Sequence, residues 1–336
     1  MKNILVTGGA GFIASHTNVV LLNGGYNVVA VDNFCNSDIS AVESVEKITG
    51  KKVKFYEGDV RDEKLMNKIF DENDIYAVIH FAGLKAVGES CAKPLLYYDN
   101  NMTSTFVLLK VMAAHGVKNF VFSSSATVYG TPEKLPLTED SPVGGVTNPY
   151  GATKFMLENV LKDVYKADNS WHIALLRYFN PVGAHESGLI GEDPNGIPNN
   201  LMPFVAKVAA GVLPCVKVFG NDYPTPDGTG VRDYIHVMDL AEGHLAALNN
   251  IEKFGATAVN LGTGIGYSVL DMIKAFSKAC GHQVPYEIVD RRPGDVASCY
   301  ASPDFAKEFI GWSAKRNLDD MCADLWRFQC NKKKQN

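Results

Sequence analysis

A tyrosine and a lysine four residues apart, Tyr150 and Lys154, are the side chains of this sequence best suited to proton transfer. At this spacing two side chains are neighbours on one face of a helix. Tyrosine is a poor base near neutral pH because its ordinary pKa is about 10, and a cation held beside the phenol lowers that pKa. The hydroxyl of Ser125 could complete a proton relay. An ordinary amphipathic helix explains the spacing equally well, so the pair alone does not establish catalysis.

A glycine-rich turn over residues 8–14 (GGAGFIA) has the context of a dinucleotide site. It follows an apolar run over 4–7 and opens a helix predicted over 12–23. Glycine allows the backbone to approach a pyrophosphate, and the helix start offers N–H groups and the positive end of its dipole. Asp32 closes the next predicted strand, where a carboxylate accepts hydrogen bonds from ribose hydroxyls and repels a 2′-phosphate. The pattern therefore favours NAD over NADP.

The first 180 residues alternate short apolar runs with longer amphipathic segments. The apolar runs are continuous, as expected for strands covered on both faces, and their alternation with helices predicts right-handed crossovers. Strands are predicted over 4–7, 28–31, 53–56, 78–81, 120–122 and 173–176, and helices over 12–23, 37–48, 63–71, 95–115 and 150–167. The predicted class is α/β, a Rossmann-type doubly wound parallel sheet with a smaller mixed α/β substrate-binding domain.

Glycine and proline become frequent after residue 180, which indicates loops, and loops on a rigid scaffold commonly carry specificity. Helices are predicted again over 201–210, 238–249, 268–280 and 319–328. We expect a cofactor domain over 1–180 and a substrate domain over 181–336, with 233–250 able to return to the first domain.

Composition excludes several classes of protein. With 46% hydrophobic and 21% charged residues and no apolar run near the roughly 20 residues of a membrane span, the chain is expected to be globular, without a membrane segment or signal peptide. A net charge of −5 without a large basic block argues against nucleic-acid binding. Seven cysteines without a C-x-x-C pair favour free thiols in a reducing compartment, the cytoplasm. The eight histidines show no metal-ligand spacing.

The glycine turn, Asp59, the run Phe81-Ala82-Gly83 and the Tyr150–Lys154 pair together resemble the extended short-chain dehydrogenase/reductase family. A narrower resemblance, to the UDP-glucose 4-epimerases, covers nearly the whole chain and weakens over 36–52, 251–258 and after 300. The runs that carry it are 83–90 (GLKAVGES), 123–130 (SSSATVYG), 177–185 (RYFNPVGAH), 199–203 (NNLMP), 219–225 (FGNDYPT) and 227–237 (DGTGVRDYIHV).

The resemblance implies interconversion of UDP-glucose and UDP-galactose, in galactose metabolism. Tightly bound NAD+ takes a hydride from C4 of the sugar and returns it to the other face of a 4-keto intermediate. Tyr150, paired with Lys154 and helped by Ser125, is the implied base for the 4-hydroxyl. The family also implies a homodimer through a four-helix contact, which the helices near 95–115 and 150–167 would supply.

The resemblance assigns most of the site residues. The implied cofactor residues are Gly8, Gly11, Phe12, Ile13, Asp32, Asn33, Asn36, Ser37, Asp59, Val60, Phe81, Ala82, Gly83, Lys85, Asn100, Tyr150, Lys154 and Phe179. The implied substrate residues are Lys85, Ser125, Tyr150, Phe179, Asn180, Asn200, Leu201, Lys217, Val218, Phe219, Arg232, Arg292, Asp295 and Cys299. Among the substrate residues, Arg232 and Arg292 are suited to bind the diphosphate. The segment 217–219 would bind uracil, and Asp295 would bind the uridine ribose. Asp59 either reaches the adenine edge or caps the following helix.

Cys299 stands where some family members carry a bulky tyrosine that excludes 2-N-acetyl sugars, while a small residue there admits them. This implies that UDP-GlcNAc and UDP-GalNAc are also interconverted. A one-residue slip in the comparison would instead place Tyr300 at that position.

Three other functions fit the sequence less well. A sugar-nucleotide 4,6-dehydratase shares the fold and the tyrosine–lysine pair, but its elimination step needs an acid and a base where this chain has Ala126 and Thr127. A non-catalytic NAD-binding regulator would be expected to lose Tyr150 or Lys154. A serine hydrolase using Ser125 lacks the G-x-S-x-G turn.

Overall fold

Seven parallel strands form the central sheet of the protein, which this computed structural model describes over residues 1–194, 196, 198–292 and 294–335. In the order in which they lie side by side, the strands are β10 (Thr257–Leu261), β6 (His172–Tyr178), β5 (Asn119–Ser125), β4 (Ile75–His80), β1 (Asn3–Thr7), β2 (Asn27–Asp32) and β3 (Lys54–Glu57). Parallel ladders join every neighbouring pair. The predicted α/β class with a parallel sheet is confirmed.

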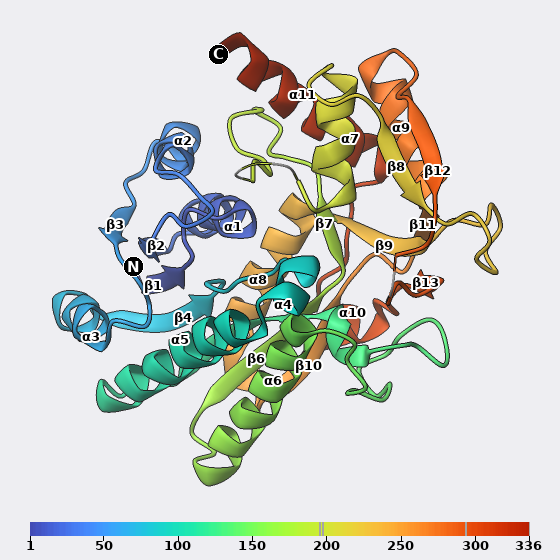
Figure 1. Cartoon of the computed structure of the whole chain (residues 1–336). Helices are drawn as coiled ribbons and strands as arrows, with labels where there is room; N and C mark the ends of the chain where they lie inside the picture. Colours follow the sequence, from blue (N-terminus) through green and yellow to red (C-terminus); the bar gives the residue numbers. More distant parts are fainter. Residues whose placement is uncertain (195, 197, 293, 336) are drawn as a thin grey trace.

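Helices cover both faces of this sheet, which explains why its strands are apolar without alternation. Side chains of successive strand residues point to opposite faces, so Ile4 and Val6 of β1 enter one core cluster and Leu5 enters the other. The first face carries α1 (Phe12–Asn23), α2 (Ser40–Thr49) and α8 (Val237–Asn249), and the second carries α3 (Glu63–Glu72), α5 (Pro94–Ala114) and α6 (Pro149–Ala167). The layers are visible in Figure 1.

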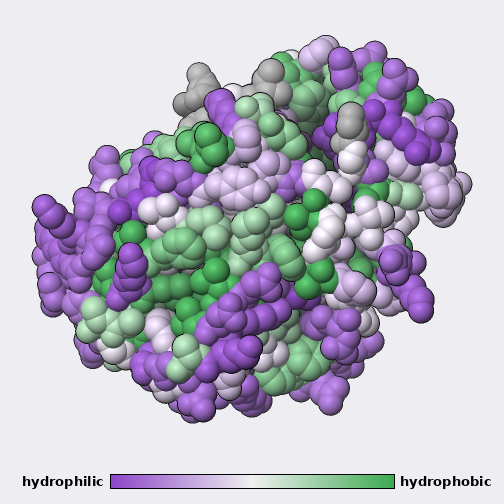
Figure 2. Space-filling view, turned by 60° about the horizontal axis from the view of Figure 1, so that its bottom comes forward, coloured by the Kyte–Doolittle hydropathy of each residue, from purple (hydrophilic) through white to green (hydrophobic). Residues whose placement is uncertain are grey.

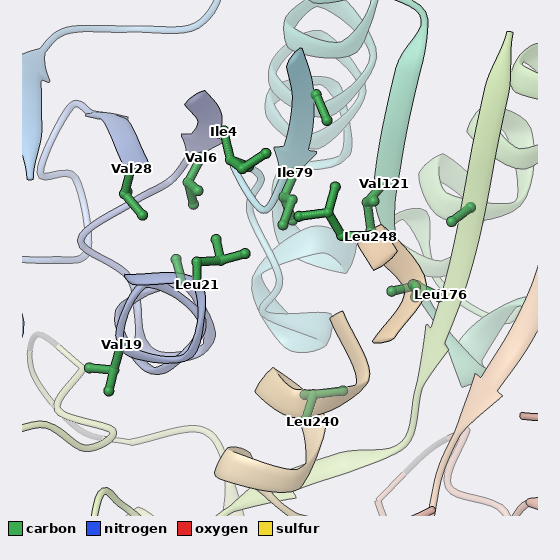
Figure 3. Packing of buried hydrophobic residues seen from close by; sticks show 14 of the residues in the cluster. Ile4, Val6, Val19, Leu21, Val28, Ile79, Val121, Leu176, Leu240 and Leu248 are labelled. Carbon is green, nitrogen blue, oxygen red and sulfur yellow. The ribbon is translucent and has the colours of Figure 1, made fainter. Parts of the chain in front are cut away.

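Several elements from the second half of the chain take part in this layered core, among them α8 (Val237–Asn249) and β10. Helix α8 contributes Leu240 and Leu248 to the same cluster as Leu21 of α1 and Ile79 of the sheet (Figure 3). Strand β10 pairs with β6 and forms one edge of the sheet. The sequence did not predict β10, because its residues (TAVNL) interrupt the apolar run with a buried asparagine. The domain division at residue 180 stays a prediction.

Most predicted boundaries differ from the structure by one to three residues, and the three clearest differences concern helices. The helix expected over 37–48 begins at Ser40, because the hydroxyl of Ser37 instead donates to Asp32 Oδ1 at 2.8 Å. A short helix, α4 (Val87–Ala92), precedes α5. The last helix, α11 (Leu318–Gln335), continues beyond the predicted end at residue 328.

The second half builds a smaller mixed α/β part, at the upper right of Figure 1. Strand β9 (Val231–His236) pairs in parallel with β7 (Asn180–Val182) and β13 (Ser298–Cys299), and antiparallel with β11 (Gly266–Ser268). A separate parallel pair joins β8 (Val216–Phe219) to β12 (Tyr286–Val289). Helices α7 (Leu201–Ala209), α9 (Val269–Cys280) and α11 share a core with these strands, while α10 (Asp304–Ile310) packs against the first core cluster.

The carboxyl ends of the central strands all lie along one edge of the sheet, because the strands are parallel. The glycine turn follows β1, and Ser125 ends β5. In open α/β sheets ligands bind at this edge, at the point where the strand order reverses, which here lies between β1 and β4. Among the helices of the described residues, none is long and apolar enough to cross a membrane.

Candidate active site

Three consecutive serines at the end of β5 face three residues of α6 that lie on one side of the helix. The hydroxyl of Ser125 interacts with the hydroxyl of Tyr150, which lowers the pKa of the phenol. Lys154 Nζ donates to the carbonyl oxygen of Ser123 at 2.5 Å. The hydroxyl of Ser124 donates to Glu158 Oε1 at 2.6 Å. Because residues 150, 154 and 158 are spaced by four, one helix face meets the end of one strand.

Local sequence fixes where α6 begins and so which residues face β5. Pro149 occupies the first turn, where its missing N–H costs no hydrogen bond. Asn148 caps the helix, accepting a hydrogen bond from the Gly151 N–H through Oδ1 at 2.8 Å. Tyr150 therefore lies in the first turn, near the loops at the carboxyl edge, and Lys154 lies one turn deeper.

A buried ion pair anchors the third residue of this helix face. Arg177 of β6 donates to both carboxylate oxygens of Glu158, from Nε to Oε1 at 2.9 Å and from Nη2 to Oε2 at 2.7 Å. Its Nη1 donates to the hydroxyl of Tyr129 at 2.9 Å. Both charged side chains are at most 2% exposed, and Glu158 holds the pKa of Arg177 above its ordinary value despite burial. The pair fixes α6 against β5 and β6.

The Tyr150 phenol is half-buried, and burial raises its pKa above the ordinary value. The interaction with the Ser125 hydroxyl and the positive charge of Lys85 both lower this pKa. The sequence led us to expect that Lys154 lowers this pKa, but in the structure its ammonium group is directed to the Ser123 carbonyl and lies 4.9 Å from the centre of the Phe122 ring. The cation that acts on the phenol in the chain alone is Lys85.

Lys154 is almost fully buried, and burial lowers its pKa to about 8. Its ammonium lies 6.0 Å from the centre of the Tyr150 ring. Near neutral pH the lysine is mostly protonated, but a small change of environment can release its proton. This is a sensitivity that a solvent-exposed lysine lacks.

The glycine at position 8 lets the turn after β1 approach the loop after β4 more closely than a larger residue would allow. Gly8 has a φ of +66°, and a Cβ there would lie 2.8 Å from the backbone nitrogen of Ala82. The turn after β1 thus touches the loop after β4. Asp32 holds the turn in place, since its Oδ2 accepts from the Ala10 N–H at 3.0 Å and its Oδ1 accepts from the Phe34 N–H at 2.9 Å. These residues form a cradle that fits a dinucleotide pyrophosphate and ribose.

The other predicted cofactor residues lie along the same edge. Phe12 and Ile13 begin α1, Asn33, Asn36 and Ser37 follow β2, Asp59 and Val60 follow β3, Phe81, Gly83 and Lys85 follow β4, Asn100 lies in α5, and Phe179 follows β6. Asp59 accepts from Asn33 Nδ2 at 3.2 Å and pairs with Arg61 at 2.9 Å. The alternative that Asp59 caps the next helix is wrong, because Asp62 accepts the hydrogen bonds from the first N–H groups of α3.

Charged residues of the second half gather around Tyr234. Burial raises the pKa of this tyrosine to about 12, while Arg232 and Arg292 lower it and Asp295 raises it further. Arg292 also donates to Asp295 at 3.1 Å and lies 4.6 Å above the ring of Phe219. The structure thus brings together four residues that the sequence assigned to a uridine diphosphate. Lys217 and Val218 precede Phe219 on β8. The side chains of Lys217 and of Asn180, on β7, are exposed.

Residues predicted to bind the sugar part of the substrate also contact one another through Glu192. Lys85 Nζ lies 3.0 Å from Glu192 Oε1, and Asn200 Nδ2 donates to the same oxygen at 2.7 Å. Leu201 is the first residue of α7. Cys299 packs in the cluster that contains Phe179.

Cys299 and Tyr300 are consecutive, so their side chains point in opposite directions. The Tyr300 ring lies beside Gly266, where a Cβ would be 3.3 Å from Tyr300 Cδ1, whereas the half-buried Cys299 lies on the Phe179 side. Burial raises the pKa of the Cys299 thiol to about 11, so it is neutral near neutral pH.

Several residues that build the site were not found from the sequence. Glu158, Arg177 and Glu192 make the contacts described above, and Asn101 of α5 holds the loop that carries Lys85, accepting from the Leu84 N–H at 2.8 Å. These partners are 8 to 107 residues from the groups they bind, and none of these separations is a helical or strand spacing that marks the contact in the sequence. Within the described part of the chain no group of three or more His, Cys, Asp or Glu side chains could hold a metal ion.

Comparison with known proteins shows similarity along the whole chain. A family described as GDP-mannose 4,6 dehydratase matches residues 5–325. A UDP-glucose 4-epimerase from Bacillus subtilis is 64% identical over 327 residues, which cover 97% of this chain and 96% of that protein. The crystal structure of UDP-glucose 4-epimerase from Bifidobacterium longum in complex with NAD+ and UDP is 63% identical, with a TM-score of 0.97 and 99% coverage of both chains. A UDP-Glc/GlcNAc 4-epimerase from Campylobacter jejuni is 33% identical, with a TM-score of 0.85 and coverage of 98% and 100%.

The lowered pKa of Lys154 predicts a pH-dependent stability. Between pH 8 and 10.5 the unfolded chain keeps a proton that the folded chain has released, so unfolding takes up a proton and folded-state stability rises with pH. The free energy of unfolding of wild type should therefore gain up to about 3 kcal/mol relative to Lys154→Met across this window. Urea denaturation of both cofactor-free proteins at several pH values measures this change.

Lys162→Met, on the same helix with a lysine side chain 43% exposed, is the control for removing a positive charge. A difference between wild type and Lys154→Met that stays constant from pH 8 to 10 would contradict the buried position of the ammonium.

Proposed function

This chain belongs to the family of UDP-glucose 4-epimerases, which interconvert UDP-glucose and UDP-galactose with NAD. We propose that Tyr150 is the acid–base group of this reaction and that Lys154 and Ser125 are its partners. The observation that supports these roles is the position of the Tyr150 phenol. It is half-buried at the carboxyl edge, where the Ser125 hydroxyl and the charge of Lys85 both lower its pKa.

The reaction needs one group that takes a proton from the sugar 4-hydroxyl and returns it within the same cycle. Burial raises the pKa of Tyr150, which favours return of the proton, while Ser125 and Lys85 favour the phenolate, which removes it. NAD, when bound, supplies the acceptor and donor of the C4 hydride and a positive charge near the phenol. Lys154, one turn below Tyr150, is placed to hold the nicotinamide ribose.

The cofactor and the substrate would be held by separate groups of residues. Gly8 and Gly11 offer their backbone to the pyrophosphate, and Asp32 accepts from ribose hydroxyls. On the substrate side, Arg232 and Arg292 would bind the diphosphate, with Phe219 beside the uracil and Asp295 at the ribose. Because the UDP would be bound at a distance from the Tyr150 phenol, the sugar could rotate and present either of its faces to the phenol.

The 4,6-dehydratase alternative lacks its chemical groups. Ala126 and Thr127 follow Ser125 directly, in a short 3-10 helix, and neither side chain carries a carboxyl that can donate and accept protons at the neighbouring carbons. The most similar relatives reported above are epimerases rather than dehydratases.

We infer that the chain acts in the cytoplasm and forms a homodimer. All seven cysteines are free thiols, as in reducing compartments. Large hydrophobic side chains are exposed on one face of α5 and α6: Leu95 (81%), Leu96 (43%), Phe106 (38%) and Met156 (43%). Figure 2 shows hydrophobic side chains gathered over this side of the molecule. Two such helices from each of two copies, related by a twofold axis, would bury these residues in a four-helix contact.

Replacing the tyrosine hydroxyl tests the catalytic role. Tyr150→Phe should lower kcat on UDP-galactose about a hundredfold or more, because no other group replaces the acid–base function. The fold and the bound NAD should be retained, which circular dichroism and cofactor content measure. Tyr165→Phe, further along α6, is the matched control. Full activity of Tyr150→Phe would discard the proposed role.

Cys299 predicts acceptance of N-acetylated substrates. We propose that the small side chain beside Phe179 leaves room for the 2-N-acetyl group, so wild type should interconvert UDP-GlcNAc and UDP-GalNAc. Cys299→Tyr should abolish this turnover and keep that of UDP-galactose, while Cys299→Ala should keep both. Absence of turnover of both acetylated sugars by wild type would rule the proposal out.

The dimer predicts a change of mass on inserting a charge into the exposed face. Wild type should have twice the 36.6 kDa chain mass in light scattering after size exclusion, and Phe106→Glu should shift it toward the monomer because a buried unpaired carboxylate is costly. Val212→Glu, exposed on the loop after α7, is the control and should remain dimeric. A monomeric wild type would contradict the inference.

A further inference from the structure

Asp233, in the middle of β9, is a buried carboxylate that accepts hydrogen bonds from two segments far from it in the sequence. Its Oδ1 accepts from the N–H of Thr263 at 2.8 Å and from the Thr263 hydroxyl at 2.6 Å. Its Oδ2 accepts from the N–H of Gly264 at 3.0 Å and from the N–H of Ala301 at 3.1 Å. The residue is 0% exposed, so these donors take the place of water around the carboxylate.

The two segments that Asp233 holds belong to different parts of the fold. Thr263 and Gly264 lie in the loop that follows β10 at the edge of the central sheet. Ala301 lies in residues 297–302, which include β13 and which we call the wall segment. The carboxylate therefore ties β9, the edge of the central sheet and the wall segment together at one point.

The wall segment carries Cys299 next to a residue proposed to bind the diphosphate. In the parallel ladder of β9 and β13, Cys299 pairs with Arg232. Burial raises the pKa of the Cys299 thiol and the charge of Arg232 lowers it, which agrees with this proximity. Asp233 follows Arg232 and points to the opposite side of the strand. Because its carboxylate is surrounded by donors of the protein, it can position the wall segment without touching the substrate.

The packing around Asp233 leaves the wall segment little freedom to move. A Cβ at Gly262 would lie 2.7 Å from Asp233 Oδ2 and 2.8 Å from the Cβ of Ala301, so only glycine permits this approach. The N–H of Leu137 also donates to the carbonyl oxygen of Tyr300 at 2.9 Å. That second anchor joins two backbone groups, whereas the Asp233 carboxylate is an anchor that a substitution can remove.

We propose that Asp233 is a positioning residue for substrate selectivity, because it fixes the place of Cys299, beside the 2-position of the sugar, relative to Arg232, which holds the diphosphate. The sugar is joined covalently to the diphosphate, so its C2 substituent lies at a set distance from that anchor. A wall segment held in place makes the size of residue 299 decisive, while a released segment yields to the ligand. The proposal rests on the proposed substrate roles of Arg232 and Cys299.

Selectivity in a Cys299→Tyr background tests the proposal on the holoenzyme. The quantity measured is the ratio of kcat/KM for UDP-GalNAc to kcat/KM for UDP-galactose, which Cys299→Tyr alone should lower about a hundredfold or more. Adding Asp233→Asn turns an acceptor into a donor that faces N–H groups and so releases the wall segment. The ratio should then rise again by about tenfold, the effect of one hydrogen bond to a charged group. A general loss of structure would lower both rates and would not restore turnover of the larger substrate.

Thr263→Val in the same Cys299→Tyr background is the matched control. It removes the hydroxyl that donates to Oδ1 and leaves the bond between Oδ2 and the N–H of Ala301 in place. Its thermal midpoint should fall, because a buried hydrogen bond is lost, while the selectivity ratio stays that of Cys299→Tyr. A ratio that rises equally with Asp233→Asn and Thr263→Val, or with neither, would overturn the proposal.

Gly262→Ala provides a second test, which decides the matter if Asp233→Asn does not fold. Its methyl group would push Ala301 and the Asp233 carboxylate apart without removing a charge. The ratio measured without the Cys299→Tyr change should differ from that of wild type by about fivefold or more, since the wall segment has to shift. A folded Gly262→Ala protein with the wild-type ratio would contradict the role of Asp233.

The Cys299 variants separate the two ways in which the proposal can fail. If wild type does not use UDP-GalNAc, or if Cys299→Tyr leaves the ratio unchanged, the proposed role of residue 299 is wrong and the role of Asp233 falls with it. If Cys299→Tyr lowers the ratio and a folded Asp233→Asn protein does not restore it, residue 299 keeps its role and only that of Asp233 is refuted.

Discussion

The buried ion pair between Glu158 and Arg177 is the interaction on which the active site depends. It joins α6 to β6, and the Ser124 hydroxyl adds β5 to the same carboxylate. A helix turns by 100° per residue, so a slip of α6 by one position would move the Tyr150–Lys154 face away from the serines. Removing one partner of such a pair costs about 3–5 kcal/mol because the other charge is left buried. The pair thus specifies a register as well as contributing to stability.

Parallel strands impose the second constraint, because they bring every strand end to one edge. The turn after β1 touches the loop after β4 through Gly8 and Ala82, at the point where the strand order reverses. Ser125 and the first turn of α6 lie further along the same edge. A nucleotide held at the reversal would extend toward the phenol of Tyr150, and in the second half of the chain Arg232 and Arg292 lie around Tyr234, where we propose that the diphosphate binds.

Local patterns were sufficient to predict much of this arrangement. The continuous apolar runs predicted six strands of the sheet, because burial on both faces requires them. The cofactor roles of the glycine turn and Asp32 stay predictions. Strand β10 was missed because Asn260, whose Oδ1 accepts from the Tyr129 hydroxyl at 2.7 Å, interrupts its apolar pattern. Glu192 was missed because Lys85 lies 107 residues away and Asn200, eight residues away, lies across an irregular loop. In the chain alone the Ser123 carbonyl binds the Lys154 ammonium and it is the charge of Lys85 that lowers the pKa of Tyr150, while the catalytic role of Lys154 stays a prediction.

These constraints lead to one central claim, that the hydrogen at C4 leaves the sugar and returns to it inside a single site served by Tyr150. The most direct measurement uses UDP-galactose deuterated at C4, purified protein and no added NAD+, with mass spectrometry of the product. The account predicts UDP-glucose that retains the deuterium. Product that has lost the label to solvent, or no product even after NAD+ is added, would contradict it.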